Sequence, residues 1–324
     1  MNEPGHPLIS VIIPCYNAAK FLDEALRSVL GQAGVDLEVL LVDDGSTDDP
    51  ESVVRRIGDT RVRYSRTPPS GGPSRPRNLG LAQARGAFVF FFDADDVMMP
   101  GKLAAQVDLM ARHPEWAMTF TNFKVIDPQG VTTTSDFLAD YRTFHRLRQL
   151  ALTDSDGLPR EPLYLGLLRA NFIGTSSVAV RREVLEQVGG FDVGLASSED
   201  LDMWLRIASG HDCGYLDIIG HAYRLHPASL MHQFEARHPL SRIEVLRRHL
   251  PGVRDPHTRR TIIRRLGSNY VNLGYISEVH GDAASARRHY LASLRLSPTA
   301  GALGGYLKCL IGGPFLRRSR KAGS

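Results

Sequence analysis

The sequence contains no uninterrupted apolar run of about 18 residues, so we expect no transmembrane helix. Its N-terminus, MNEPGHPLIS, lacks the basic start and apolar core of a secretory signal. The three cysteines, Cys15, Cys213 and Cys309, are too widely spaced for a metal pattern or a disulfide framework. Together these features favour a protein of the reducing cytoplasm.

Basic residues are not interleaved with aromatic residues on a recognisable module, which argues against nucleic-acid binding. Charge is instead distributed unevenly along the 324 residues, whose net charge is +4. Residues 236–324 contain 17 Lys and Arg but four Asp and Glu, a net of +13, which leaves −9 for the remainder. This asymmetry predicts two parts with different roles, a domain at 1–235 and a basic helical region at 236–324.

Short apolar runs alternate with helical patterns through the first part. LISVIIPCYN, LEVLLVDD, RVRYSR, FVFFFDADD and AMTFTNFKVID predict strands, and CGYLDIIGHAYRLH predicts a pair of strands. AAKFLDEALRSVLGQ places Phe21, Ala25 and Val29 on one stripe of a helix. Residues of about 132–170 lack clear periodicity and predict an irregular insertion with short helices. The alternation predicts an α/β fold, a mixed and mostly parallel sheet with helices on both faces.

Carboxylates directly follow two of these strands. Asp43 and Asp44 end one, and three aspartates of the DADD segment, 93–96, end another. Because ligands bind at the carboxyl ends of such strands, both clusters are expected to share one site. An Asp-x-Asp suits Mg²⁺ or Mn²⁺, which takes one or two carboxylates and completes its shell with water and phosphate. In an extended strand Asp93 and Asp95 would point to the same side. The structural alternative is that these aspartates cap a helix or stabilise a turn.

Five segments, in order, resemble the family 2 glycosyltransferases of the GT-A (Rossmann-like) fold. They are VIIPCYNAAKFLDEALRSVLGQ, LEVLLVDDGSTDD, ARGAFVFFFDADD, GGFD and SSEDLDMWLRIA, within about residues 8–230. The resemblance implies an inverting, hexosyltransferase-type enzyme that uses Mn²⁺ or Mg²⁺. Its implied substrates are a nucleotide-sugar donor and the hydroxyl of a glycan or lipid-linked acceptor, in the synthesis of surface polysaccharide or another glycan.

The resemblance also implies roles for single residues. Asp200 would be the base that deprotonates the acceptor hydroxyl, with Glu199 beside it. Asp95 and His226 would bind the metal, which stabilises the charge on the leaving diphosphate. Asp44 would accept a hydrogen bond from a uracil or thymine imide, which favours a UDP- or dTDP-sugar. The nucleotide-sugar site would consist of Pro14, Tyr16, Asn17, Asp44, Arg77, Asp93 and Ala94.

Each role has a structural alternative. Tyr16 is expected to stack on the nucleobase, but it would also suit ordinary core packing. Arg77 is expected to neutralise the diphosphate, but it would also suit a solvated helix face. A helix N-terminus favours carboxylates such as Glu199 on dipole grounds alone. His226 would suit a packed surface as well as a metal. No role is assigned to Asp96.

The basic C-terminal part contains NLGYISEVHGDAASARRHYLASLRLSP, which is similar to one tetratricopeptide unit at about 265–298. The similarity places Gly274 in a first helix, Gly281 at a turn and Tyr290 in a second helix. A generic helical hairpin is the alternative. A single unit needs a neighbour, either the catalytic domain or a second copy in a homodimer. The basic tail, 314–324, is expected either to contact an anionic membrane surface peripherally or to be solvated.

Two other functions are compatible with parts of this pattern. A nucleotidyltransferase also places carboxylates and a metal on such a sheet, but PCYNAAKFL lacks the Gly-rich, basic phosphate loop that it would need. A non-catalytic nucleotide-sugar-binding module would be favoured by loss of the acidic motifs, and all of them are present.

Overall fold

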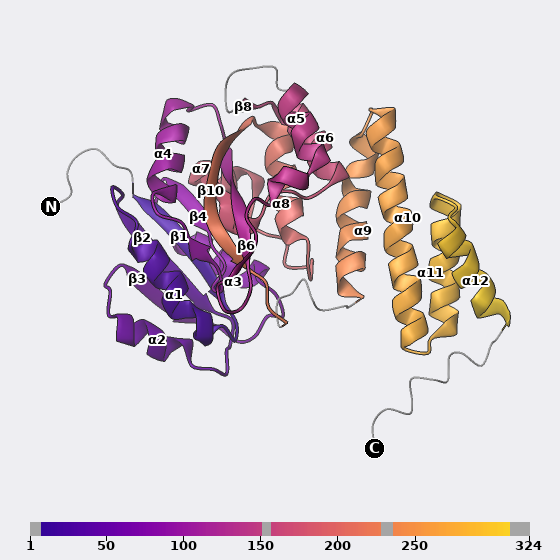
Figure 1. The fold of residues 1–324 in the computed structure, drawn as a ribbon, viewed down its shortest axis with the longest axis horizontal. Helices are drawn as coiled ribbons and strands as arrows, with labels where there is room; N and C mark the ends of the chain where they lie inside the picture. Colours follow the sequence, from indigo (N-terminus) through magenta and orange to yellow (C-terminus); the bar gives the residue numbers. More distant parts are fainter. Residues whose placement is uncertain (1–7, 151–156, 228–235, 312–324) are drawn as a thin grey trace. The chain divides into compact units, whose positions relative to one another are not determined.

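The computed structural model describes residues 8–150, 157–227 and 236–311 (Figure 1). These residues form two compact units, an N-terminal unit (8–195 and 199–227) and a C-terminal unit (196–198 and 236–311). The boundary predicted at residue 235 and the basic tail at 314–324 lie outside the described residues. Among the described helices none is long and apolar enough to cross a membrane.

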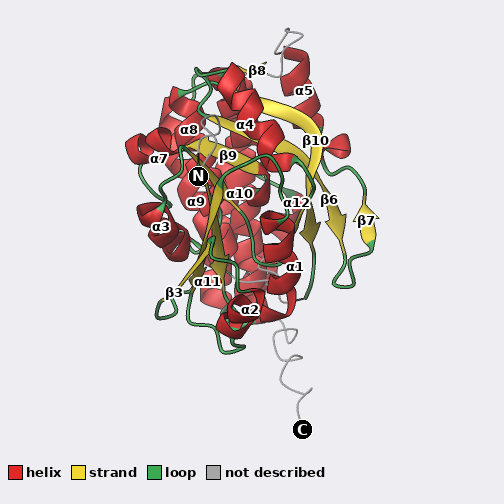
Figure 2. Ribbon diagram, turned by 90° about the vertical axis from the view of Figure 1, so that its left-hand side faces the viewer, coloured by secondary structure: helices red, strands yellow, loops and turns green. Residues whose placement is uncertain are grey.

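The described part of the N-terminal unit is built on one ten-stranded sheet of order β3-β2-β1-β4-β9-β6-β10-β5, in which β7 pairs with β6 and β8 with β10. Neighbours among β3, β2, β1 and β4 are parallel, as are β6 and β10, while β9 is antiparallel to both β4 and β6. Figure 2 shows the β6–β7 hairpin. The predicted mixed, mostly parallel sheet is confirmed. The strands are β1 Ile9–Cys15, β2 Leu37–Asp43, β3 Val62–Arg66, β4 Phe88–Phe91, β5 Val97–Met98, β6 Met118–Ile126, β7 Thr132–Thr134, β8 Gly157–Leu158, β9 Val178–Arg181 and β10 Cys213–Arg224.

Helices cover both faces of this sheet. Apolar residues of α1 and α4 pack with Val11 on one face. On the other face α3 lies so close to β1 that a Cβ on Gly80 would stand 2.5 Å from the Ile12 side chain. The helices of this unit are α1 Ala19–Leu30, α2 Pro50–Ile57, α3 Ser74–Gln83, α4 Lys102–Arg112, α5 Arg142–Leu150, α6 Arg160–Arg169, α7 Arg182–Val188 and α8 Glu199–Gly210, with 3-10 turns at Leu138–Asp140 and Thr175–Ser177.

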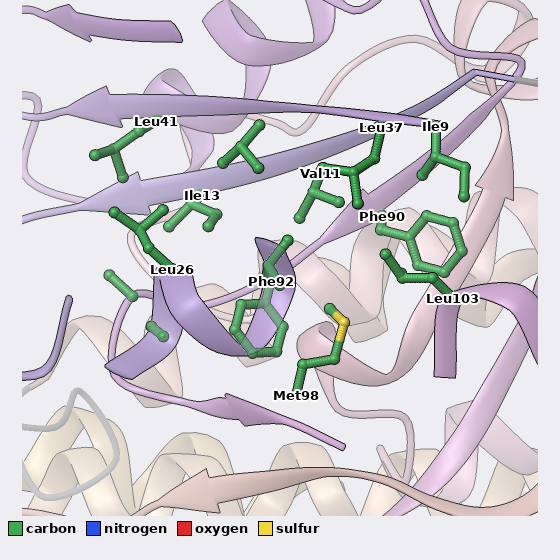
Figure 3. Close-up of a cluster of buried hydrophobic side chains, with 14 of the residues drawn as sticks. Ile9, Val11, Ile13, Leu26, Leu37, Leu41, Phe90, Phe92, Met98 and Leu103 are labelled. Carbon is green, nitrogen blue, oxygen red and sulfur yellow. The ribbon is translucent and has the colours of Figure 1, made fainter. Parts of the chain in front are cut away.

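The apolar run of β4 is buried on both faces. Phe90 and Phe92 belong to the cluster with Val11 and Leu103, shown in Figure 3. Phe91 points to the opposite face, where its ring centroid lies 6.4 Å from that of Trp204. A strand covered on both sides needs no polar alternation, which explains the continuous FVFFF.

Two local predictions were wrong. CGYLDIIGHAYRLH forms the single strand β10, whose register shifts near Ile219 in place of a turn, since no turn-forming pair interrupts it. Pro14 lies inside β1, within the strand predicted for LISVIIPCYN. Because β4 ends opposite Ile12, no ladder bond to β4 is lost at Pro14. Phe21 lies off the core stripe of α1, with its ring centroid 5.0 Å from that of His226.

One lysine of this core is fully buried. Lys102, the first residue of α4, has its ammonium 4.9 Å from the Phe90 ring centroid and makes no hydrogen bond to the described residues. Burial lowers the pKa of Lys102 to about 7. The unfolded chain keeps this proton up to about pH 10.4, so stability rises with pH between these two values.

Replacing Lys102 by methionine is therefore expected to stabilise the fold. Met fills a similar volume without a buried charge, so the free energy of unfolding at pH 7 should rise by up to about 4 kcal/mol, and the gain should disappear near pH 10.5. Urea denaturation at pH 7 and pH 9 measures this effect, with Lys20→Met on the exposed side of α1 as the control. A destabilised Lys102→Met at pH 7 would show that the ammonium is held by favourable interactions.

The C-terminal unit is helical, and Figure 1 shows α10, α11 and α12 side by side. The Tyr290 ring fills the space between two glycines, because a Cβ on Gly274 or Gly305 would stand 2.7 or 2.4 Å from it. Gly281 turns the chain with a φ of 78°. The predicted hairpin is thus present. The helices are α9 Arg237–His249, α10 Pro256–Val279, α11 Ala283–Leu296 and α12 Ala300–Ile311, with a 3-10 turn at Leu250–Gly252.

Candidate active site

Acidic segments follow β2 and β4 at the same edge of the sheet. β1 and β2 are parallel and end level, with Cys15 opposite Asp43. β4 runs parallel to β1 but ends at Phe91, so Asp93 and Asp95 lie in the turn that leads to β5. The strand-like alternation expected for these two aspartates is therefore wrong. A turn can direct each of them to a different partner.

Arg77 joins two of the acidic motifs. Its Nη2 lies 2.8 Å from Asp93 Oδ1 and its Nη1 lies 2.7 Å from Glu199 Oε1. The guanidinium is buried and packs 5.3 Å from the Phe191 ring centroid. The solvated helix face considered for Arg77 is thereby excluded. Both of its terminal nitrogens are bound to protein carboxylates, so Arg77 fixes the distance between the turn after β4 and the start of α8.

The charges in this cluster do not balance. Burial raises the pKa of Asp93 and of Glu199, and Asp200 raises both pKa values further, as Asp95 does for Asp93, while Arg77 opposes both shifts. Burial would lower the pKa of Arg77, but the surrounding carboxylates raise it. Several carboxylates thus share one guanidinium. The excess negative charge is of the kind that a divalent cation neutralises.

Asp95 faces His226, with Oδ2 2.9 Å from Nε2. Carboxylate and imidazole together suit Mn²⁺ better than Mg²⁺. Among the described residues no cluster of three or more His, Cys, Asp or Glu has the arrangement of a metal site. The two side chains fit a cation that takes its other ligands from diphosphate and water.

The Asp96 side chain is buried and binds the backbone of the sheet. Its carboxyl is buried, and Oδ1 accepts a 3.0 Å hydrogen bond from the backbone N–H of Arg224 in β10. Burial, with the charges of Asp95 and Asp93, raises the pKa of Asp96 well above its ordinary value. The Arg224 side chain in turn donates to the Asp95 carbonyl at 2.9 Å. Arg224, which carried no signal in the sequence, therefore fixes the acidic turn to the sheet.

Asp200 begins α8 together with Glu199. Its Oδ1 accepts from the Leu201 N–H at 2.7 Å and its Oδ2 accepts from Asn171 Nδ2 at 2.9 Å. Asn171 follows α6 at the end of the insertion, and its own Oδ1 is buried without a partner among the described residues. Sequence reasoning missed Asn171, because a single asparagine outside a motif gives no signal.

The loops after β1 and β2 hold one another. Asn17 has a φ of 50°, and its Oδ1 accepts a 2.8 Å hydrogen bond from the Thr47 N–H. The Ser46 Oγ accepts from the Asn17 N–H at 3.0 Å. Tyr16 projects from this junction with 59% of its surface exposed, which excludes the core packing considered for it. An exposed ring on a fixed loop is available for stacking.

Asp44 and Ala94 are both buried. The Asp44 carboxylate accepts hydrogen bonds from the Ser70 N–H at 3.0 Å and from the Ser70 hydroxyl at 2.9 Å. Asp44 thus binds the loop after β3 to the end of β2. Ala94 packs in the apolar cluster with Phe92 and Met98, which anchors the acidic turn.

An acidic strand edge on a mixed, mostly parallel sheet of this order defines the GT-A fold. The model of Glycosyl transferase family 2 matches residues 10–187, and the chain belongs to this family. An uncharacterized glycosyltransferase of Haemophilus influenzae is 38% identical over 143 residues, which are 42% of this chain and 56% of that protein.

Further comparisons cover more of the chain. The Escherichia coli UDP-Glc:alpha-D-GlcNAc-diphosphoundecaprenol beta-1,3-glucosyltransferase WfgD is 27% identical over 228 residues, 69% of this chain and 79% of that protein. Residues 1–349 of S. aureus TarS in complex with UDP-GlcNAc have a TM-score of 0.63 at 18% identity, covering 93% of this chain and 88% of that TarS chain. A Pyrobaculum calidifontis mannosyltransferase in complex with GDP-Man and Mn²⁺ has a TM-score of 0.55 at 20% identity, covering 97% of this chain and 83% of that chain. The chain spans 27% to 63% of the first three curated relatives.

Proposed function

We propose that the N-terminal unit is the catalytic domain of an inverting glycosyltransferase that moves a sugar from a nucleoside diphosphate to an acceptor hydroxyl. The observation that carries this proposal is the double ion pair of Arg77, which joins Asp93 of the acidic turn to Glu199 beside Asp200. Donor-side and acceptor-side carboxylates of a single displacement must lie together in this way.

Asp200 is the proposed general base. Its two carboxylate oxygens each accept one hydrogen bond from the protein, which orients the carboxylate and leaves lone pairs for an acceptor hydroxyl. Asp200 removes the hydroxyl proton as the acceptor oxygen attacks the anomeric carbon. Attack on the face opposite the leaving diphosphate inverts the anomeric centre in one displacement.

Asp95 and His226 are proposed to hold Mn²⁺ or Mg²⁺. When bound, the cation supplies Lewis-acid stabilisation of the leaving diphosphate. Two properties support this role. Asp95 Oδ2 and His226 Nε2, the two atoms that would ligate the cation, lie 2.9 Å apart, and the surrounding carboxylates supply excess negative charge. Asp93, whose carboxylate is fixed by Arg77, is proposed to face the ribose.

The donor is proposed to carry uracil or thymine. Tyr16 offers an exposed ring. The Asp44 carboxylate follows the neighbouring strand, and its oxygens, which also accept from Ser70, keep lone pairs for an imide N–H. An acceptor oxygen pairs with the imide N–H of uracil, which cytosine lacks. TarS, which has the same fold, binds UDP-GlcNAc.

The acceptor is proposed to be a glycan of the cell envelope, and a lipid-linked one is favoured. WfgD, which covers most of this chain, acts on a diphosphoundecaprenol-linked sugar, and a further relative is the succinoglycan biosynthesis protein ExoO of Rhizobium meliloti. We further propose a cytoplasmic protein whose hairpin α10–α11 is one tetratricopeptide-like unit. The space that Gly274 leaves for Tyr290 supports this.

Release of nucleoside diphosphate tests the proposal. The protein is incubated with Mn²⁺ and, separately, UDP-, dTDP-, GDP- and CDP-sugars, and the products are separated by anion-exchange chromatography. Release of UDP or dTDP is expected. The assay can be run without knowledge of the acceptor, because it measures hydrolysis of the donor. Release of pyrophosphate would indicate a nucleotidyltransferase instead. Binding without any turnover would indicate a nucleotide-sugar-binding module.

Replacing Asp95 by alanine is expected to weaken nucleotide binding in Mn²⁺ by at least about tenfold, since the variant would lose one of the two side chains that would hold the cation, and the cation would neutralise the diphosphate. Binding in EDTA should be equal for the variant and the unchanged protein. Isothermal titration with UDP measures both. Asp108→Ala, at an exposed position on α4, is the matched control. Equal Mn²⁺-dependent binding by both variants would contradict the assignment of Asp95.

A further inference from the structure

Five aromatic rings of the N-terminal unit lie next to one another. β6 and β10 are neighbours, with Phe123 opposite His221 (Figure 1). The Phe123 ring stacks on that of His221 at a centroid distance of 4.8 Å and on that of Phe137 at 4.1 Å. Tyr223 meets Phe123 edge-on, with the centroids 6.1 Å apart. Tyr141 lies 5.0 Å from Phe137. We call these five residues the aromatic array.

The segment that carries Phe137 is fixed to β6. The Phe137 N–H donates to the Phe123 carbonyl at 2.9 Å. On either side of Phe137, the Asn122 side chain donates to Asp136 Oδ1 at 2.6 Å and accepts from the Leu138 N–H at 3.1 Å. The insertion therefore holds its part of the aromatic array in a defined place against the sheet.

The segment between α6 and β9 connects the aromatic array to the candidate active site. At its start, Asn171 binds the Asp200 carboxylate. In its middle, a Cβ on Gly174 would stand 3.1 Å from the Phe123 ring. Near its end, the Ser176 hydroxyl accepts a 3.0 Å hydrogen bond from the backbone of the acidic turn. The aromatic array thus lies against a segment that holds both the proposed base and the acidic turn.

The Tyr223 hydroxyl is close to the carboxylates of the site. Burial raises the pKa of Tyr223, and four neighbouring negative charges raise it further. These charges belong to Asp96, Asp93, Asp95 and Asp200. Carboxylates of the acidic turn and of α8 therefore both surround this hydroxyl, which makes no hydrogen bond to the described residues.

A second aromatic cluster in the same unit shows ordinary core packing. Its members are at most 2% exposed, and they are Phe120, Phe144, Phe172 and Tyr215. The Tyr215 hydroxyl donates to Asp217 Oδ1 at 2.9 Å, as expected of a buried tyrosine. Phe137, Tyr141 and Tyr223 are instead partly exposed, and neither tyrosine hydroxyl has a partner among the described residues. Accessible rings with unused hydroxyls are typical of a ligand-binding surface.

We propose that the aromatic array is the acceptor subsite, where Tyr223, Phe137 and Tyr141 bind an uncharged pyranose ring of the acceptor. The C–H faces of a pyranose pack on aromatic rings, and its hydroxyls pair with tyrosine hydroxyls. The array itself is uncharged, because burial lowers the pKa of His221 well below its ordinary value. A polyprenyl chain would leave both tyrosine hydroxyls unpaired. The inference rests on the proposed function, in which Asp200 needs an acceptor hydroxyl beside it.

Saturation-transfer difference NMR on the full-length chain tests the proposal without an identified acceptor. The probes are the methyl glycosides of glucose, galactose, mannose, N-acetylglucosamine and rhamnose, with UDP and Mg²⁺ present. Irradiation of the aromatic protons should transfer saturation to the ring protons of at least one glycoside. Lack of transfer to every glycoside would overturn the proposal. Transfer to farnesyl phosphate alone would assign the array to the lipid of the acceptor and would also overturn it.

Replacing both Phe137 and Tyr141 by alanine should raise the dissociation constant of the bound glycoside by about tenfold, because two stacking contacts are lost. Tyr275→Ala, which removes an exposed tyrosine of α10 outside the array, is the control and should leave binding unchanged. Equal affinity of the double variant and this control would contradict the subsite.

Tyr223→Phe keeps the test decisive if the double variant fails to fold. Phenylalanine keeps the ring and its packing on Phe123 and removes only the hydroxyl, so a purely structural role would leave glycoside binding unchanged. The loss of one hydrogen bond should weaken glycoside binding by about fivefold. Unchanged binding would overturn the proposal.

Donor hydrolysis by the unchanged protein separates this inference from the proposed function. Glycoside binding that the array substitutions reduce, in a protein that hydrolyses no donor, would contradict the proposed function and leave the subsite supported. Donor hydrolysis without binding of any glycoside would overturn the subsite alone.

Discussion

Replacing Asp200 by asparagine is expected to lower the rate of sugar transfer by about 1,000-fold and to leave donor affinity within about twofold. Asparagine keeps the size of the aspartate and one acceptor oxygen but cannot take a proton, and general-base catalysis contributes a factor of about 10²–10⁴. The backbone bond from Leu201 at 2.7 Å is available to the amide oxygen, so the start of α8 should remain in place. Transfer is followed with the donor identified by the hydrolysis screen, and affinity by titration with the nucleoside diphosphate.

Asn171→Ala is the companion variant. It removes the 2.9 Å hydrogen bond that orients Asp200, and a loss of about tenfold in the transfer rate is expected. Because Asn171 is proposed to act through Asp200, the double variant should be no slower than Asp200→Asn alone. Multiplying losses would show that Asn171 acts independently. Near-normal transfer by Asp200→Asn, with Asp108→Asn as control, would refute the base assignment itself.

Replacing Arg77 by methionine is expected to destabilise the fold by about 3–5 kcal/mol. Removing one partner of a buried ion pair leaves the other charge uncompensated, and here two carboxylates, Asp93 and Glu199, lose the same guanidinium. Arg77→Lys should recover only part of the loss, because an ammonium cannot pair with two carboxylates in the planar fork of a guanidinium. Urea denaturation at pH 7.5 measures the difference.

The loss should depend on pH in a defined direction. Without Arg77 the pKa of both carboxyls would rise further above their unfolded values, so the folded state would bind more protons than the unfolded state. The stability of the variant should then fall as pH rises through these pKa values and recover partly at pH 5.

Adding Asp93→Asn and Glu199→Gln to the Arg77→Met variant should also restore stability. Arg27→Met breaks a surface pair with Asp23 at 2.7 Å and should destabilise the fold far less than Arg77→Met does. An Arg77→Met protein as stable as this control would contradict the structural role.

The sheet could be predicted from the sequence because its strands are covered on both faces. Continuous apolar runs such as FVFFF are buried through Phe90 on one side and Phe91 on the other. The carboxyl-end rule then placed the Asp44 and Asp93 segments at one edge, since the strands before them are parallel. Motifs read from local sequence were thus sufficient for the fold and for placing these two acidic segments at one edge of the sheet.

The pairing within the site could not be predicted in the same way. Arg77 was expected to meet a diphosphate, and its two carboxylate partners come from segments with no local relation to it. Nothing in the sequence indicated that Asn171 and Lys102 are special. What sets them apart is that their polar atoms are buried, and burial is determined by tertiary packing. Ser198 directly precedes α8 and is of a residue type that N-caps favour, yet its φ of 59° is outside the extended region that N-caps adopt.

The ion pairs of the site also bear on how the protein is made. Arg77 and Glu199 are separated by 122 positions in the chain, and Asp95 and His226 by 131. A chain that emerges from the ribosome therefore presents the carboxylates of the acidic turn long before α8 and His226 exist to meet them. Parallel pairing between β6 and β10 imposes the same delay on the sheet. The nascent N-terminal unit should thus stay incomplete, and in need of protection from aggregation, until about residue 226 has been released.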